Sequence, residues 1–149
     1  MKKILVHVML PLLMTSSLAI AESTKEETYS ELKPIASDIY HRSIALVELI
    51  PDSYQSYSYT DDKAVWRKAK DERNALSNEA KKLGNVLSSP FKHCIQLANF
   101  SGSLWGQSMS GDGKMDSSFF QMYTTAKKDC KYQLDNLPED KSNLRAVDL

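Results

Sequence analysis

The sequence predicts an all-α protein, an up-down four-helix bundle in which a disulfide links helices 3 and 4. Three observations lead to this prediction. In four segments of the chain the apolar residues recur at spacings of three and four, which is the helical period. No segment shows the alternating β-branched residues that are typical of a strand. The chain also has two cysteines, which lie at equal distances from a glycine-containing turn.

The first 21 residues have the features of an export signal. Two lysines precede an apolar stretch between Ile4 and about Leu18. Ala19 and Ala21 then supply the small residues of a cleavage site. The apolar stretch is shorter than the roughly 20 residues that a membrane-spanning helix needs. We therefore expect residues 1–21 to be a cleaved signal peptide of bacterial type. The mature chain is then periplasmic or secreted, with no stable membrane anchor.

The mature chain is long enough for one domain and has no charge excess. We expect residues 22–137 to form a single helical-bundle domain and the polar residues 138–149 to form a C-terminal tail. Removal of the two signal lysines leaves 17 of the 19 basic residues against 19 acidic residues. A protein that binds nucleic acid without regard to sequence normally has a basic excess. We therefore expect no nucleic-acid partner.

The first two predicted helices are separated by a tyrosine-rich segment. The first helix begins near Ser30 and ends before Pro51, because proline interrupts a helix. Its apolar stripe consists of Leu32, Ile35, Ile39, Leu46, Val47 and Ile50. The second helix runs from about Asp61 to Leu87. Its stripe consists of Trp66, Ala69, Leu76, Ala80, Leu83 and Leu87. We expect residues 51–60 to form a loop, with a short strand as the alternative.

The third and fourth predicted helices form a hairpin. The third, residues 91–108, is apolar nearly all round, which is typical of a buried helix. Residues 110–114, "SGDGK", predict a turn because of their paired glycines. The fourth helix begins with Asp116 or Ser117 as its cap and ends before Pro138. Its inward residues are predicted to be Phe119, Tyr123, Ala126, Cys130, Leu134 and Leu137.

Cys94 and Cys130 are predicted to form a disulfide. In an antiparallel hairpin centred on residue 112, the midpoint of the two cysteines, both lie at the same level. An exported protein also sits where disulfides persist. The alternative is that Cys94 is a nucleophile with His93 as its base, but adjacent helical residues point about 100° apart. We expect no catalytic residues and therefore no enzyme.

The sequence predicts no metal site and no cofactor. Two of the three histidines, His41 and His93, lie outside the signal, without the Cys or His spacing typical of zinc. Residues 111–116, "GDGKMD", lack the later ligands of a calcium loop. A non-covalent haem would have to pair one of these histidines with a methionine. The candidates are Met109, Met115 and Met122.

Tyr54, Tyr57 and Tyr59 are the candidate partner-binding residues. Tyrosine combines a large ring with a hydroxyl group at little entropic cost, which suits protein interfaces. The alternative is that these rings cover the end of the bundle. We expect a small exported protein that binds another protein. Examples are an immunity or inhibitor protein that neutralises a toxin or an envelope hydrolase, or an accessory of a secretion or conjugation system. The second hypothesis is a carrier of a small apolar ligand or haem.

Overall fold

The computed structural model describes residues 17–138, with side chains described from Glu26 onwards. In this range the chain is all-helical, as predicted, and has no strand. Its helices are α1 (Ser17–Glu48), α2 (Ile50–Tyr59), α3 (Ala64–Lys82), α4 (Lys92–Ser110) and α5 (Ser117–Asp135). Most of the predicted signal peptide, residues 1–16, and most of the predicted tail, residues 139–149, lie outside the described residues.

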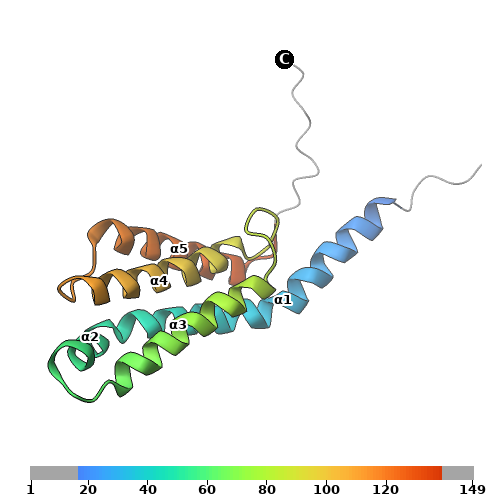
Figure 1. Cartoon of the computed structure of the whole chain (residues 1–149). Coiled ribbons are helices and arrows are strands. Elements are labelled where there is room, and N and C mark those ends of the chain that lie inside the picture. The colour runs from blue at the N-terminus through green and yellow to red at the C-terminus, as the bar shows by residue number, and fades with distance from the viewer. Residues whose placement is uncertain (1–16, 139–149) are drawn as a thin grey trace, which may run out of the picture.

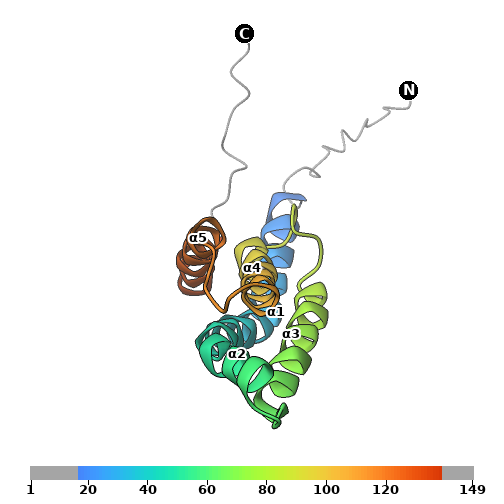
Figure 2. The ribbon, with the colours of Figure 1, turned by 60° about the vertical axis from the view of Figure 1, so that its left-hand side comes forward.

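Helix α4 is the centre of the arrangement. Like α1, it contacts each of the other four helices, and its contact with α5 is the most extensive of all, whereas α3 and α5 do not contact one another. Figures 1 and 2 show α4 and α5 side by side as a hairpin, with α1 and α3 on the other side of α4. Helix α2 lies at the end of the molecule where α1 finishes and α3 begins (Figure 1). The first turns of α1 extend beyond the other helices (Figure 1).

The core is built around the apolar faces that the sequence pattern indicates. Its largest fully buried apolar side chains are Ile39, Leu46, Ile50, Leu76, Leu83, Phe91, Leu97 and Leu104. Each such side chain contributes roughly 1.5–3 kcal/mol by leaving water. Near the start of α1, Tyr29 stacks on Phe91 with ring centroids 4.8 Å apart. Its hydroxyl donates to the carbonyls of Gln133 and Leu134, which ties α1 to the end of α5.

The prediction of four helices was incomplete, because residues 50–59 form α2 instead of a loop. Pro51 lies in the opening turn of α2, where its missing N–H removes no helical hydrogen bond. Ile50, Ser53 and Ser56 recur every three residues and are buried. Two of these three residues are serines, so the apolar pattern gives little sign of the helix. The described residues therefore do not form a simple four-helix up-down bundle. The disulfide links the fourth and fifth helices, not the third and fourth.

The first helix begins earlier than predicted. Helix α1 starts at Ser17, not near Ser30, and it continues through Pro34.

Two helix C-terminal ends also differ from the prediction. Helix α3 stops at Lys82, and Gly84 then has a φ of +87°, a conformation that glycine adopts without strain. Leu87 was expected to face inward in this helix but is 88% exposed. Leu137 was likewise expected to face inward, but α5 ends at Asp135 and leaves it 58% exposed. In both cases the apolar spacing in the sequence extends beyond the residue at which the helix ends, so the spacing alone predicted a helix that was too long.

The predicted cap of the last helix is confirmed at Asp116. Its Oδ1 atom accepts hydrogen bonds from the backbone N–H groups of Ser118 and Phe119, at 2.9 and 3.2 Å. These bonds, with one from the Ser118 hydroxyl, lower the pKa of the Asp116 carboxyl below its ordinary value. The ionised carboxylate therefore stabilises the start of α5.

Candidate protein-binding surface

The predicted cysteine pairing is confirmed, and it joins α4 to α5. The Cys94 and Cys130 sulfurs are 2.09 Å apart and the Cα atoms 4.6 Å apart, with both residues fully buried. The turn between the helices, residues 111–116, includes the predicted centre at Asp112. Because the Cys94 sulfur is bonded to Cys130, it is not a free thiol. The interpretation of Cys94 as a nucleophile is therefore wrong for this state of the protein.

The two histidines lie apart from any cluster of metal ligands. His93 Nδ1 lies 2.7 Å from Gln96 Oε1, and the His93 backbone N–H donates to Gln133 Oε1. His41 is exposed on α1, with its ring edge-on to Tyr40. Within residues 17–138, no group of three or more histidine, cysteine, aspartate or glutamate side chains is placed to hold a metal ion.

The three candidate tyrosines have different environments. Tyr54 is half-buried, and its ring lies against Gly113 in the turn between α4 and α5. A Cβ atom on Gly113 would lie only 2.5 Å from the Tyr54 ring, so the glycine makes room for this contact. Tyr57 and Tyr59 are 46% and 75% exposed. Tyr54 therefore connects α2 to the hairpin, while Tyr57 and Tyr59 remain accessible to a partner.

A tryptophan extends this exposed area onto α3. Trp66 is half-buried and stacks on Tyr57, with ring centroids 5.3 Å apart. The ammonium groups of Lys63 and Lys70 lie 5.4 Å from the Tyr57 ring centroid and 5.2 Å from the Trp66 ring centroid. Tyr59 lies on another side of α2, with its ring edge-on to Tyr54 and the centroids 6.0 Å apart. Tyr57, Tyr59 and Trp66, which surround this end of α2, are together called the aromatic surface below. Trp66 was predicted to lie in the core stripe, and it does pack against the core while partly exposed. Its spacing of four residues from Lys70 was the available sign of their cation–π contact.

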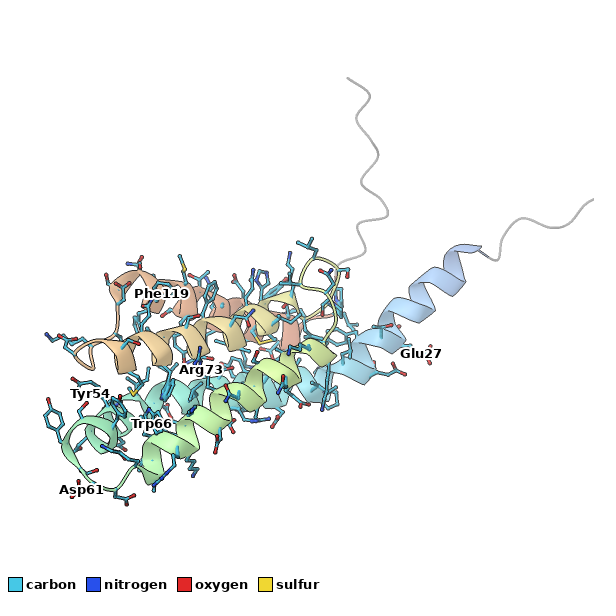
Figure 3. The ribbon with its side chains drawn as sticks, viewed as in Figure 1. Glu27, Tyr54, Asp61, Trp66, Arg73 and Phe119 are labelled. Carbon is cyan, nitrogen blue, oxygen red and sulfur yellow. A yellow bond between two sulfur atoms is a disulfide. The ribbon has the colours of Figure 1, made fainter. Side chains whose placement is uncertain are left out.

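Local hydrogen bonds hold the aromatic surface in place. The Ser56 and Thr60 hydroxyls both donate to the Asp62 carbonyl, at 2.6 and 2.8 Å. The Lys63 ammonium donates to the carbonyls of Tyr57 and Thr60 across the same turn. Figure 3 shows Asp61 at the tip of this turn, with Trp66 close to α2. The exposed rings are therefore positioned before any partner binds, which lowers the entropic cost of binding.

A second feature is an open groove of about 400 Å³ on the outer side of α4 and α5. Phe100, Met122 and Ala126 supply its apolar lining, and His93 lies at one end. Because Cys94 and Cys130 are level, Met122 lies roughly nine residues along the hairpin from His93, or about 13 Å. A haem in the groove would need both side chains to reach one iron atom from the two ends of this span.

The chain matches no family model, and comparisons with curated proteins and with solved structures found no match. None of the helices in the described part of the chain is both long enough and apolar enough to cross a membrane.

Proposed function

We propose that this is a small exported protein that acts by binding another protein through the aromatic surface. The observation that carries the proposal is the exposure of Tyr57 and Tyr59 at the end of α2, beside a locally hydrogen-bonded turn. Exposed, preorganised aromatic side chains are the residues that most often dominate binding energy at protein interfaces. The buried Cys94–Cys130 disulfide supports the export part of the proposal, because disulfides persist in oxidising compartments.

The form of the surface favours an inhibitory or immunity role. The aromatic rings lie at one end of a helical body. Its α4 and α5 helices, which have the most extensive contact with each other, are joined by the disulfide. Such an end fits into a concave partner surface, for instance the active-site cleft of a toxin or an envelope hydrolase. Occupying the cleft blocks the enzyme without any chemistry by the inhibitor. An accessory role in a secretion or conjugation system uses the same mode of binding.

The test begins with capture of the partner from an envelope extract of the native host, followed by its purification. Isothermal titration calorimetry then compares the wild-type protein with a Tyr57→Ser/Tyr59→Ser variant. We expect at least about a tenfold loss of affinity, because aromatic hot spots contribute about 2 kcal/mol or more.

The matched control is Tyr132→Ser. Tyr132 is 59% exposed and lies on α5, away from the aromatic surface. Its substitution should leave the affinity unchanged, and neither variant should lower the melting temperature much. Tyr54 is left intact, because its contact with Gly113 makes its loss a change in stability. Unchanged binding by the double variant would remove the aromatic surface from the proposal.

The carrier hypothesis is the second candidate, and the groove beside α4 and α5 is the observation that favours it. Its lining offers apolar contacts to a small apolar ligand or a haem. Native mass spectrometry of protein purified from its own compartment distinguishes the two functions. A co-purifying apolar molecule that is lost on Met122→Gln supports the carrier, whereas a mass equal to that of the polypeptide alone argues against it.

A further inference from the structure

Three cationic side chains on one face of α3 each lie over an aromatic ring. Lys63 precedes the helix, and Lys70 and Arg73 follow at helical spacing on the side that faces α2 and α4. The rings beneath them are, in the same order, Tyr57, Trp66 and Trp105. These three cations and three rings are called the cationic stripe below. In Figure 3, Trp66 lies toward the α2 end of α3 and Arg73 lies between the α3 and α4 ribbons.

The cations of the stripe are not neutralised by carboxylates. Arg42, on α1, shows the contrast: its guanidinium donates to Glu72 at 2.6 Å and to Asp38 at 2.9 Å, which raises the pKa of Arg42. None of the three cations of the stripe forms an ion pair with a carboxylate of residues 26–138. Aromatic rings attract a cation without cancelling its charge. The stripe therefore presents positive charge on a chain that has no basic excess.

Arg73 borders a polar pocket of about 350 Å³ between α3 and α4. The arginine stem lies on Gly102, where an added Cβ would be 3.3 Å from Arg73 Cγ. Its guanidinium lies beyond the pocket lining, with Cζ 3.7 Å from a Cβ added at Gly106 and 5.8 Å from the Trp105 ring centroid. Asn74 and Asn99 supply amides, and Ser77 and Ser103 supply hydroxyl groups. An arginine can bind a carboxylate through two parallel hydrogen bonds. The amides and hydroxyl groups of the pocket, with the Arg73 guanidinium beside it, therefore offer donors for one carboxylate side chain.

We propose that the cationic stripe binds an acidic segment of the partner protein, with one aspartate or glutamate side chain in the Arg73 pocket. This inference rests on the proposed function and names the chemistry of the partner. From Lys63 to Arg73 the stripe spans ten residues of helix, or about 15 Å, which an extended peptide covers with about five residues. A short acidic segment therefore reaches the pocket while its neighbours contact Lys63 and Lys70.

The test uses acetylated, amidated hexaglutamate as the probe, with hexaglutamine as the uncharged control. Both tryptophans of the chain, Trp66 and Trp105, belong to the stripe, so their fluorescence reports binding there. We expect a saturable change with hexaglutamate, weakened by added salt, and none with hexaglutamine. Arg73→Gln should weaken binding about tenfold.

The matched control is Lys68→Gln, which removes one charge from the same helix. Lys68 lies five residues before Arg73 and hence about 140° around α3 from it. Binding should be unchanged in this variant. Equal losses in the two variants, or no saturable change with hexaglutamate, would overturn the proposal. Inorganic phosphate that competes as well as the peptide would also overturn it, because the pocket would then be a site for small anions.

The two proposals fail in different ways once the purified partner is in hand. If the Tyr57→Ser/Tyr59→Ser variant loses binding while Arg73→Gln and added salt have no effect, the aromatic surface stands and the acidic-segment inference is wrong. If Arg73→Gln alone weakens binding of both the partner and hexaglutamate, the cationic stripe stands and the aromatic surface is wrong.

Discussion

The α4–α5 hairpin and the α2–α3 hairpin are stabilised by different interactions. The first buries apolar side chains on two helices of equal length and is closed by the Cys94–Cys130 disulfide. The second pairs a ten-residue helix with a longer one through a turn of side-chain-to-backbone hydrogen bonds. Its rings and cations lie on the outside of this turn.

The difference shows a division between scaffold and binding surface. A covalent bond and a buried core stabilise the α4–α5 hairpin, so its stability does not depend on its exposed side chains. The α2–α3 region instead places Tyr57 and Tyr59 at the surface, with Tyr57 stacked on the half-buried Trp66, and both tyrosines remain open to a partner. The Tyr54–Gly113 contact joins the two regions, so the exposed rings keep a fixed position relative to the hairpin.

Of the changes that test this comparison, removal of the disulfide should cause the largest loss in the free energy of unfolding. The bridge closes a loop with a sequence separation of 36 residues. The chain-entropy model gives such a loop about 4 kcal/mol of stability. We expect Cys94→Ala/Cys130→Ala to lower the free energy of unfolding by about this amount in urea denaturation followed by circular dichroism. The control is the wild-type protein in reducing agent. If the double variant and the reduced wild type each lose less than about 1 kcal/mol, packing alone holds the hairpin together.

Substitution of Gly113, where α2 meets the α4–α5 turn, should cause the next largest loss of stability. Gly113 and Gly84 both have positive φ, +80° and +87°, but only Gly113 has a side chain against it. We expect Gly84→Ala to cost about 1 kcal/mol from backbone strain alone. Gly113→Ala should cost about 2–3 kcal/mol, because its Cβ also meets the Tyr54 ring.

The double variant Tyr54→Ala/Gly113→Ala tests the coupling between the two regions. If the ring causes the extra cost, the two substitutions together should cost less than the sum of their separate effects. Thermal unfolding of the four proteins in this cycle provides the measurement. Additive costs would show that Tyr54 and Gly113 act independently.

The smallest expected change in stability is the pH-dependent contribution of Asp116, the cap of α5. The pKa of Asp116 is lowered in the folded protein, so the unfolded chain binds its proton more tightly. Its contribution to stability is therefore complete above the ordinary value of 3.8 and is lost as the pH falls through the lower, folded value. Asp116→Asn keeps a capping oxygen but cannot ionise.

The measurement for this prediction is the difference in melting temperature between the wild-type protein and Asp116→Asn from pH 7 to below pH 3. That difference should shrink or reverse in acid, because only the wild type loses a carboxylate cap. Asp112 also has a lowered pKa, owing to Lys114, but it is present in both proteins and cancels. A constant difference across the range would mean that ionisation of Asp116 does not matter.

Much of the α-helical content could be predicted because its signals are local. Apolar spacing, the Asp116 cap and the paired glycines of the turn all act over a few residues. The cysteine pairing followed from one further step, the equal distance of Cys94 and Cys130 from that turn. Helix α2 was missed because its inward residues include two serines, and because Pro51 is compatible with both a helix end and a helix start.

The candidate site was predicted only in part. The sequence by itself determined that this chain is helical, that its cysteines pair, and that three of its seven tyrosines cluster within six residues of chain. Only the tertiary structure decided that Tyr54 packs on Gly113 while Tyr57 and Tyr59 stay exposed. It also decided that Trp66 stacks on Tyr57 and that Arg73 lies over Trp105. The physical reason is that helical period and capping depend on neighbouring residues. Exposure and cation–π contacts instead depend on which helix faces meet, and that is decided by residues far apart in the chain.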